Sequence, residues 1–282
     1  MNEQFDPVKY KEDLRKDWDE KIEIYYERYV SKRIGPFKSV EKLIEGTSLL
    51  ERDRVLDVAT GTGVVALEAL KKVGSNGRVV GIDISTGALA IARKLSSNFR
   101  NLEFLEMDAE DLKFPDRSFD VVTSEFALMF FPNVQKALKE IKRVLVENGR
   151  IAVSVHGSAE NAPFFSVITS SILDYIPHIV PAGRPSPHRF GDPEILSNEF
   201  AMAGFKNIHV ESYTYAYNAG TFEDYWQDYM ESTAFSLRAK MEELDPESHE
   251  KIKAESREKA KRFLKDDMIV FPWQVLIASA KS

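Results

Sequence analysis

Between Arg54 and His156 the chain alternates short apolar runs with longer stretches in which apolar residues recur at helical spacing. The short runs predict strands at Arg54–Val58, Arg78–Ile82, Leu102–Glu106, Phe119–Thr123 and Ile151–Val155. The longer stretches predict helices at Val64–Val73, Ser85–Leu95 and Asn133–Leu145, with a turn at Asn148-Gly149. Strands that alternate with helices in this way indicate βαβ units, and therefore a doubly wound α/β fold with a mostly parallel sheet.

The pattern changes after His156. Five prolines fall between residues 157 and 190, too many for regular α/β units. Asp192 and Pro193 then mark the start of a helix that runs to Gly204, because aspartate caps helices and proline fits their first position. The remaining predicted elements are a strand at Asn207–Tyr217, a helical stretch at Thr221–Lys265 and a final strand at Trp273–Ser279.

These patterns divide the chain into a sheet core and a cap. The core is expected at 51–156, with a further helix and strand at 191–217 and the last strand at 271–282. The cap is expected to be helical and to cover the carboxyl edge of the sheet. Its predicted parts are an N-terminal segment at 1–50 and insertions at 157–190 and 218–270.

Composition and charge exclude several classes of protein. The chain has no cysteine, which excludes disulfides, thiolate metal sites and a cysteine nucleophile. A net charge of −7 argues against sequence-independent binding of nucleic acid, which needs a basic surface. The first twenty residues have no apolar signal region, and no uncharged apolar stretch is long enough to span a membrane, so we expect a cytoplasmic protein. The five histidines are scattered and predict no metal site.

A glycine-containing loop follows the first predicted strand directly. Asp57 lies near the end of that strand, and Ala59, Gly61 and Gly63 lie in the loop before the next helix. Glycines there allow positive φ and close approach of a ligand, and the helix N-terminus offers free N–H groups. Asp83 follows about 20 residues after the glycine loop. Nucleotide-binding folds place at this spacing an acidic residue that binds the ribose of the ligand.

The glycine loop and Asp83 alone do not decide between two possible cofactors. A nicotinamide dinucleotide and S-adenosylmethionine both fit a glycine loop of this kind. Asp57 favours the second, because its carboxylate would repel a pyrophosphate but suits the cationic ammonium of a methionine moiety.

Four stretches, in this order, resemble the motifs of the class I, seven-strand methyltransferases that use S-adenosylmethionine. They are VLDVATGTGVVALEAL (55–70), GIDIS (81–85), EMDAEDLKFPDRSFDVV (106–122) and ALKEIKRVLVENGRIAVS (137–154). The pattern is most similar to the small-molecule branch that includes ubiquinone- and menaquinone-biosynthesis-type enzymes. The resemblance implies a seven-stranded sheet with an antiparallel last strand, and makes residues 51–156 the cofactor-binding core. Ala59 replaces the first glycine of the family motif.

The resemblance also assigns roles along the cofactor. Asp57, Gly61 and Gly63 would surround its methionine part, with Ala59 beside them. Asp83 would accept hydrogen bonds from the ribose hydroxyls, and Ile84 would pack against the adenine. Asp108 would accept from the adenine amino group, and the Ala109 backbone N–H would donate to the ring. Asp108 could alternatively cap the turn that follows it.

Two further predictions concern the end of the site where a methyl group would be transferred. Ser124 would lie beside the methyl group, and Phe126 could face the sulfonium as a cation–π partner. If the acceptor needs a base, His156 at the end of its strand is the first candidate and His188 the second.

We therefore expect an enzyme that transfers a methyl group from S-adenosylmethionine to O, C or N of a small organic molecule by direct displacement, leaving S-adenosylhomocysteine. The run Ser124-Glu125-Phe126-Ala127 lacks the prolines and asparagine expected for methylation of adenine or glutamine amino groups. Two alternatives are an NAD-dependent Rossmann oxidoreductase and a non-catalytic S-adenosylmethionine-binding module. The substrate and the oligomeric state cannot be read from the sequence.

Overall fold

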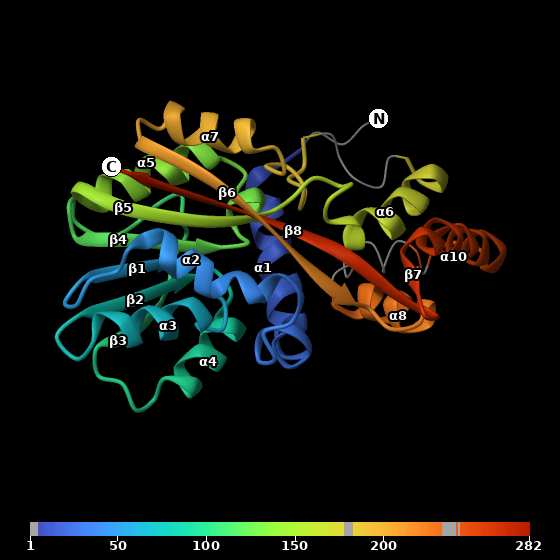
Figure 1. Cartoon of the computed structure of the whole chain (residues 1–282), viewed down its shortest axis with the longest axis horizontal. Helices are drawn as coiled ribbons and strands as arrows, with labels where there is room; N and C mark the ends of the chain where they lie inside the picture. Colours follow the sequence, from blue (N-terminus) through green and yellow to red (C-terminus); the bar gives the residue numbers. More distant parts are fainter. Residues whose placement is uncertain (1–4, 178–182, 233–240, 242) are drawn as a thin grey trace.

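A computed structural model describes residues 5–177, 183–232, 241 and 243–282 of the chain, and its elements are labelled in Figure 1. Seven strands form the main sheet in the order β3-β2-β1-β4-β5-β8-β6, and β7 pairs with β8 outside this order. The strands are β1 (Arg54–Val58), β2 (Arg78–Asp83), β3 (Leu102–Glu106), β4 (Phe119–Glu125), β5 (Leu145–His156), β6 (Lys206–Asn218), β7 (Leu264–Lys265) and β8 (Met268–Lys281). Strands β1 to β5 are parallel, and β8 runs antiparallel to both β5 and β6. The expected mostly parallel, seven-stranded sheet with an antiparallel last strand is confirmed.

The helices follow the predicted alternation with the strands. They are α1 (Pro7–Tyr25), α2 (Val40–Thr47), α3 (Val64–Val73), α4 (Thr86–Leu95), α5 (Val134–Val144), α6 (Pro163–Tyr175), α7 (Pro193–Met202), α8 (Phe222–Ser232) and α10 (Pro246–Ala260). Short π- or 3₁₀-helical turns are η1 (Tyr26–Val30), η2 (Gly35–Ser39), η3 (Leu128–Phe130) and η4 (Lys261–Phe263). The Ser85 hydroxyl caps α4 by accepting from the Ala88 N–H at 3.0 Å, and the Asp192 carboxylate caps α7 by accepting from the Glu194 N–H at 2.8 Å.

Two predicted boundaries are wrong. The helical stretch expected at Thr221–Lys265 is interrupted, because Asp245 and Pro246 start a new helix, α10, and β7 follows at Leu264. Part of that stretch lies outside the described residues. The turn expected at Asn148-Gly149 lies inside β5, where Asn148 has a φ of +58°. Residues 146–149 are skipped in the pairing with β4, so the turn signal marks an irregularity within one strand.

Strand order fixes where a ligand can enter. The chain moves from β1 outward through β2 to β3, then returns to the other side of β1 with β4 and continues to β5. Because parallel crossovers are right-handed, this reversal places the connecting helices on both faces of the sheet. The carboxyl ends of β1 and β4 therefore form the topological switch point, where open α/β sheets bind ligands.

Helices gather beyond this carboxyl edge. Strands β6 and β8 stay paired as far as Asn218 and Val270, whereas the pairing of β5 with β8 ends at His156 and Val275. Helices α6, α8 and α10 pack on one another around this extended pair of strands, and α1 packs against α4 and α8 (Figure 1). The predicted cap segment 1–50 also includes α2, which packs on β4, β5 and β8, so this part of the segment lies on the face of the sheet. The remaining division into segments stays a prediction.

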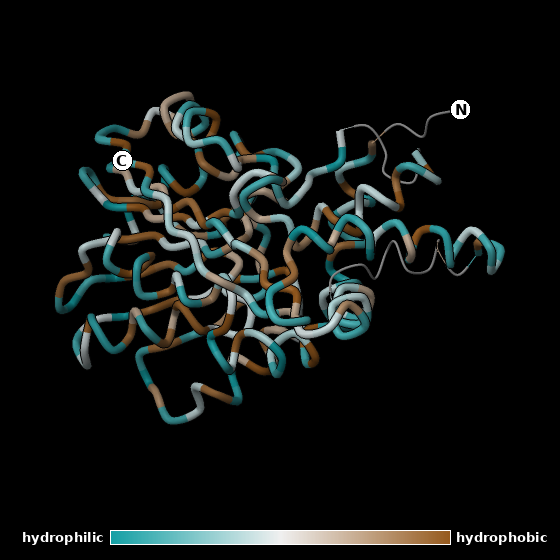
Figure 2. The backbone as a smooth tube through the Cα atoms, turned by 45° about the vertical axis from the view of Figure 1, so that its right-hand side comes forward, coloured by the Kyte–Doolittle hydropathy of each residue, from teal (hydrophilic) through white to brown (hydrophobic). Residues whose placement is uncertain are grey.

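The core lies between the sheet and its covering helices. Figure 2 shows hydrophobic residues along the central strands and hydrophilic residues on the outer helices and loops. The strand residues Val55, Leu56, Val121 and Val122 are completely buried. None of the described helices is both long and apolar enough to cross a bilayer.

Candidate functional site

A cavity opens at the carboxyl ends of β1, β2 and β4, at the switch point of the sheet. Eight of the ten residues predicted to bind the cofactor line it, whereas Gly63 and Ser124 do not, and neither does the candidate base His156. The eight are Asp57, Ala59, Gly61, Asp83, Ile84, Asp108, Ala109 and Phe126. Helix α1 contributes residues from a distant part of the sequence, among them Lys11, Trp18 and Tyr25.

The loop after β1 depends on residues with left-handed backbone. Ala59, Gly61 and Gly63 have φ values of +54°, +54° and +84°. A Cβ added at Gly61 would meet no atom within 4 Å, so the loop leaves open space at this backbone position. A Cβ added at Gly63 would lie 2.8 Å from the Phe104 ring, so this glycine allows close packing of α3. The two glycines therefore have different roles: Gly61 leaves room for a ligand, and Gly63 allows close packing of α3.

Asp57 is buried at the floor of the cavity. Its Oδ2 accepts a hydrogen bond from the Thr60 hydroxyl at 2.6 Å, and its Oδ1 accepts from the Thr123 hydroxyl at 2.7 Å. Burial, with a smaller contribution from the nearby Asp83, raises the pKa of Asp57 to about 6 against the opposing effect of the two threonine hydrogen bonds. The carboxyl group is thus poised between its charged and neutral forms close to neutral pH.

Asp83 holds the glycine loop and the start of α4 together. Its Oδ2 accepts from the Gly61 N–H at 2.8 Å, and its Oδ1 accepts from the Ser85 N–H at 2.9 Å. Burial raises the pKa of Asp83, and these backbone N–H groups oppose the shift. Asp83 therefore lies beside the glycine loop, with each carboxylate oxygen directed toward a backbone N–H group.

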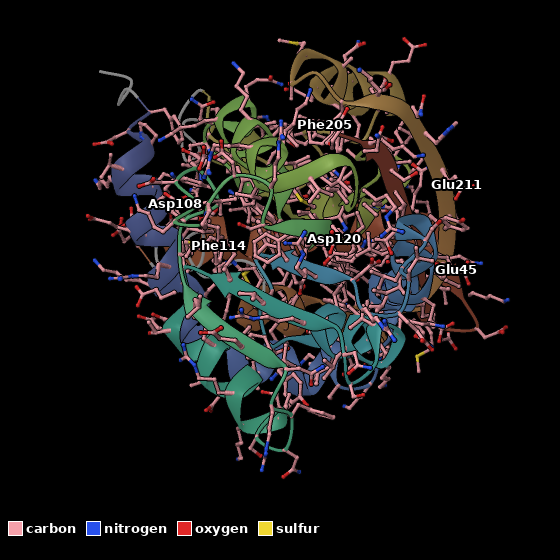
Figure 3. All side chains as sticks on the ribbon, turned by 90° about the vertical axis from the view of Figure 1, so that its left-hand side faces the viewer. Glu45, Asp108, Phe114, Asp120, Phe205 and Glu211 are labelled. Carbon is pink, nitrogen blue, oxygen red and sulfur yellow. The ribbon has the colours of Figure 1, made fainter. Side chains whose placement is uncertain are left out.

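Asp108 lies at the β3 end of the cavity, beside α1 (Figure 3). Its Oδ2 pairs with the Lys11 ammonium at 2.7 Å, and its Oδ1 accepts from the Glu110 N–H at 2.9 Å. The Lys11 ammonium also pairs with Glu110 at 2.7 Å. Asp108 thus does cap the turn that follows it, and the same carboxylate ties α1 to this end of the cavity.

The methyl-transfer end differs from the prediction. Ser124 is completely buried and does not line the cavity, and no described residue bonds to its Oγ. Phe126 does line the cavity. Its ring packs edge-on against Phe37 with centroids 5.7 Å apart and stacks on the His156 ring at 4.5 Å.

The structure does not support His156 as a base. Its ring is buried among Phe126, Phe165 and Trp273, outside the cavity lining, and its Nδ1 accepts a hydrogen bond from the Trp273 indole at 3.1 Å. Burial lowers the pKa of His156 to about 3, so the ring stays neutral and is a weak base. His188, the second candidate, bonds through Nδ1 to the Gly157 carbonyl at 2.8 Å, and burial lowers its pKa as well.

Sequence reasoning gave no role to Glu125. This residue ends β4 and lines the cavity, and burial raises the pKa of its carboxyl group well above the usual range. The available signal was a carboxylate at the carboxyl end of a largely buried strand at the switch point. Lys11 had no signal of this kind, because its place beside Asp108 depends on how α1 docks. Among the described residues, no group of three or more potential ligands could hold a metal ion.

Comparisons with known proteins agree with this geometry. A family model described as a methyltransferase domain matches residues 49–179. The demethylmenaquinone methyltransferase of Staphylococcus carnosus is 30% identical over 188 residues, which cover 62% of this chain and 76% of that protein.

Solved structures share the fold. The YcgJ protein of Bacillus subtilis superimposes with a TM-score of 0.59 at 18% identity, covering 87% of this chain and 98% of that one. Phosphoethanolamine N-methyltransferase 2 of Haemonchus contortus, solved in complex with S-adenosyl-L-methionine, gives a TM-score of 0.61 at 18% identity, covering 96% of this chain and 60% of that one.

The fold, with its ligand cavity at the switch point, is that of the Rossmann-like class I methyltransferases. The chain belongs to the S-adenosylmethionine-dependent methyltransferases and resembles their menaquinone-type branch. The protein is therefore a transferase whose cofactor is S-adenosyl-L-methionine. The expectation that it methylates small molecules is confirmed.

Proposed function

We propose that this methyltransferase transfers the methyl group by direct displacement to a small, largely apolar acceptor with an aromatic or quinone-like skeleton. The observation that carries the proposal is the composition of the cavity wall beside β4. Tyr25, Phe37 and Phe126 supply aromatic surface there, and Val30 and Ile22 supply aliphatic surface. Of the described lining residues only Lys11 is cationic, and it pairs with Asp108 and Glu110 at the opposite end.

The cofactor occupies the other end of the cavity in this proposal. Asp83 accepts from the ribose hydroxyls, Ile84 packs against the adenine, and Asp108 and the Ala109 N–H bond to its edge. The methionine part lies over the glycine loop near Asp57. The open space at Gly61 supports this placement, because a ligand can approach the backbone there.

Gly63, Ser124 and His156 make no direct contact with ligand in this proposal. Gly63 lets α3 pack closely on Phe104 and so keeps the loop in place. His156 supports the Phe126 ring from the side away from the cavity. Phe126 itself belongs to both ends, because its ring borders the acceptor and can face the sulfonium.

The cofactor brings a methyl group already activated by a positively charged sulfur, so the task left to the protein is positioning. Holding the acceptor's nucleophilic atom in line with the methyl group contributes most of what the side chains can supply. Rigid aromatic walls suit this task, since Phe37 and Phe126 hold each other edge-on. Apolar walls also exclude water from the reacting atoms.

The acceptor class draws further support from the relatives. The proteins of 29–32% identity are named for methylation of demethylmenaquinone, and a quinone-type ring would fit flat between aromatic side chains. The net charge of −7 and the acidic cavity edge fit a small molecule better than nucleic acid. A cytoplasmic location remains part of the same proposal.

Transfer of a labelled methyl group tests this function. The protein is incubated with methyl-tritiated S-adenosylmethionine and, in separate reactions, 1,4-naphthoquinol, phosphoethanolamine and a mixed DNA oligonucleotide. We expect label in the organic-soluble naphthoquinol product. Label in the oligonucleotide, or in phosphoethanolamine with none in naphthoquinol, would contradict the proposed acceptor class.

A further inference from the structure

Glu125 occupies a distinct place along the carboxyl edge of the sheet. The strand order places Asp108 after β3, Asp83 at the end of β2, Asp57 in β1 and Glu125 at the end of β4. Because β4 lies on the side of β1 away from β2 and β3, Glu125 is the acidic residue farthest from the adenine end. It therefore falls beside the aromatic wall proposed for the acceptor.

The side chain of Glu125 faces the same side as Asp57. Thr123 and Glu125 lie two residues apart on one strand, so their side chains project from the same face of the sheet. Thr123 pairs in register with Asp57 and donates a hydrogen bond to it. Glu125 continues that face beyond the floor of the cavity, and it is a lining residue.

Glu125 differs from the buried carboxylates Asp57 and Asp228 in having an oxygen without a partner among the described residues. Its Oε1 is shielded from solvent, and no described residue bonds to it. Both oxygens of Asp57 accept hydrogen bonds from threonines, and Asp228 is bonded by Arg28, Tyr29 and Tyr217. Because buried polar groups are almost always paired, an unpaired carboxylate oxygen in a ligand cavity points to a partner that arrives with the ligand.

The charged and titratable groups around Glu125 are few. Asp57 on β1 raises the pKa of Glu125, and Arg33, just after η1, lowers it less than burial raises it. The Arg33 guanidinium is itself bonded to Glu68 on α3. On α1, Tyr25 has its own pKa raised, chiefly by burial and then by the charge of Glu125. Glu125 is thus a carboxyl group whose raised pKa favours its protonated form and whose Oε1 has no partner among the described residues.

We propose that Glu125 binds an acidic hydroxyl group of the acceptor, phenolic or enolic, and takes its proton during methyl transfer. This inference rests on the proposed function, because it requires an acceptor bound against Tyr25, Phe37 and Phe126. It narrows the substrate class to hydroxylated, largely apolar ring compounds. It also assigns a catalytic residue in place of the histidine expected from the sequence.

The step balances in atoms and charge. Glu125, as a carboxylate, removes the hydroxyl proton while the acceptor forms its new bond to the methyl carbon, through the oxygen or through the ring carbon beside it. On the carbon route, the methylated ring carbon then loses its own hydrogen as a proton to solvent and the oxygen takes up a proton from solvent, which restores the ring hydroxyl. The bond from sulfur to the methyl carbon breaks with its electron pair staying on sulfur, which leaves neutral S-adenosylhomocysteine. The proton then passes from Glu125 to solvent. Burial raises the pKa of Glu125, which makes its carboxylate a stronger proton acceptor than that of an exposed glutamate.

A hydroxyl group explains the site better than an amine. An ammonium bound at Glu125 would bring a second positive charge next to the cofactor's sulfonium, and the two would repel each other in apolar surroundings. A neutral hydroxyl adds no charge before it reacts. It also supplies the single donor that one free carboxylate oxygen needs.

Equilibrium binding of 2-naphthol to the protein saturated with S-adenosylhomocysteine tests the inference without turnover. Wild type is compared with Glu125→Gln and with Glu147→Gln, which replaces an exposed glutamate on β5. We expect about tenfold weaker binding of 2-naphthol by Glu125→Gln, the loss typical of a charge-assisted hydrogen bond, and wild-type binding by the control. Affinity of the wild type should rise with pH as Glu125 ionises and fall once 2-naphthol itself ionises. Glu125→Gln should lose the rising limb.

Other outcomes distinguish the role of Glu125 from the proposed function as a whole. Equal 2-naphthol affinity and equal pH dependence in wild type and Glu125→Gln would overturn the role of Glu125 and leave the proposed function intact. Failure of wild type to bind 2-naphthol would contradict the proposed function itself. Weaker binding of S-adenosylhomocysteine by Glu125→Gln, measured by calorimetry on protein with wild-type thermal unfolding, would place Glu125 in the cofactor site and overturn the inference.

Discussion

The two ends of the cavity are built in different ways. At the end between β3 and β1, Asp83 is the last residue of β2, and Asp108 and Gly61 lie in the short loops after β3 and β1. The end beside β4 brings Tyr25 and Phe37 from the N-terminal segment against Glu125 and Phe126. Local sequence therefore defines the first end, whereas packing of distant segments creates the second. A cofactor shared across a family suits the first arrangement, and a variable acceptor suits the second.

The largest expected effect concerns the cofactor end alone. Asp83→Ala removes the acceptor of two proposed ribose hydrogen bonds and also frees the Gly61 and Ser85 N–H groups. We expect at least about a hundredfold weaker binding of S-adenosylhomocysteine, since each hydrogen bond to a charged group contributes about 1.5–3 kcal/mol. Calorimetric titration measures this loss. Asp111→Ala, at an exposed site paired with Lys113, is the control and should bind normally. Wild-type affinity in Asp83→Ala would reject the ribose role.

A pair of glycine substitutions separates fold from binding within the same loop. Both glycines have positive φ, so alanine costs about 1–2 kcal/mol at either position. Gly63→Ala should cost about 2 kcal/mol more in urea unfolding, because the new Cβ collides with the Phe104 ring. Gly61→Ala should unfold at higher urea concentration than Gly63→Ala and yet bind S-adenosylhomocysteine more weakly than wild type. Equal unfolding free energies for the two variants would contradict the separate roles.

Asp57 lies at the boundary between the two ends of the cavity. Its raised pKa predicts that the stability of the protein depends on pH. Its pKa is about 6 in the folded protein, above the usual value near 3.8, so the folded state holds the proton more tightly than the unfolded state. The ligand-free protein should therefore lose about 1 kcal/mol of unfolding free energy as the pH rises from 5 to 7. The pKa values of Asp83 and Glu125 are also raised, so each group likewise lowers the unfolding free energy as the pH rises through its own pKa. Asp57→Asn should reduce this slope in urea titrations. A slope unchanged by the substitution would show that Asp57 is ionised throughout.

The smallest expected effect concerns the acceptor end alone. Phe37→Leu keeps an apolar side chain but removes the ring contacts with Tyr25 and Phe126. We expect about fivefold weaker binding of 2-naphthol, as one aromatic pair contributes about 0.5–1.5 kcal/mol, and no change for S-adenosylhomocysteine. Phe99→Leu, at an exposed position, is the control. A change in cofactor affinity without a change in 2-naphthol affinity would reverse the assignment of the two ends.

The same contrast explains what could be predicted from the sequence. The strands β1 and β3 and the helix α3 have the predicted bounds, because alternating hydrophobic runs and glycine turns are local signals. The lining by Asp83 and Asp108 was predictable for the same reason. The burial of His156 was not, because it depends on Phe126, Phe165 and Trp273 meeting around the ring. The position of Ser124 missed the cavity by one residue, since neighbouring side chains on a strand point to opposite faces.

The individual contacts through which α1 docks could not be predicted from local patterns either. Asp19 accepts hydrogen bonds from the Ser85 hydroxyl and the Gly87 N–H, and Lys11 pairs with Asp108. These contacts join residues 66–97 positions apart, and nothing in the charged N-terminal sequence singles them out. Tertiary packing alone brings Trp18 and Tyr25 to the cavity.

A crystal structure of the protein with S-adenosylhomocysteine tests the division of the cavity most directly. We expect the ribose at Asp83, the adenine between Ile84 and Ala109, and the amino acid part over Gly61. The space between Tyr25, Phe37 and Glu125 should stay free of the cofactor. Homocysteine placed against Glu125, with the glycine loop uncontacted, would contradict the account.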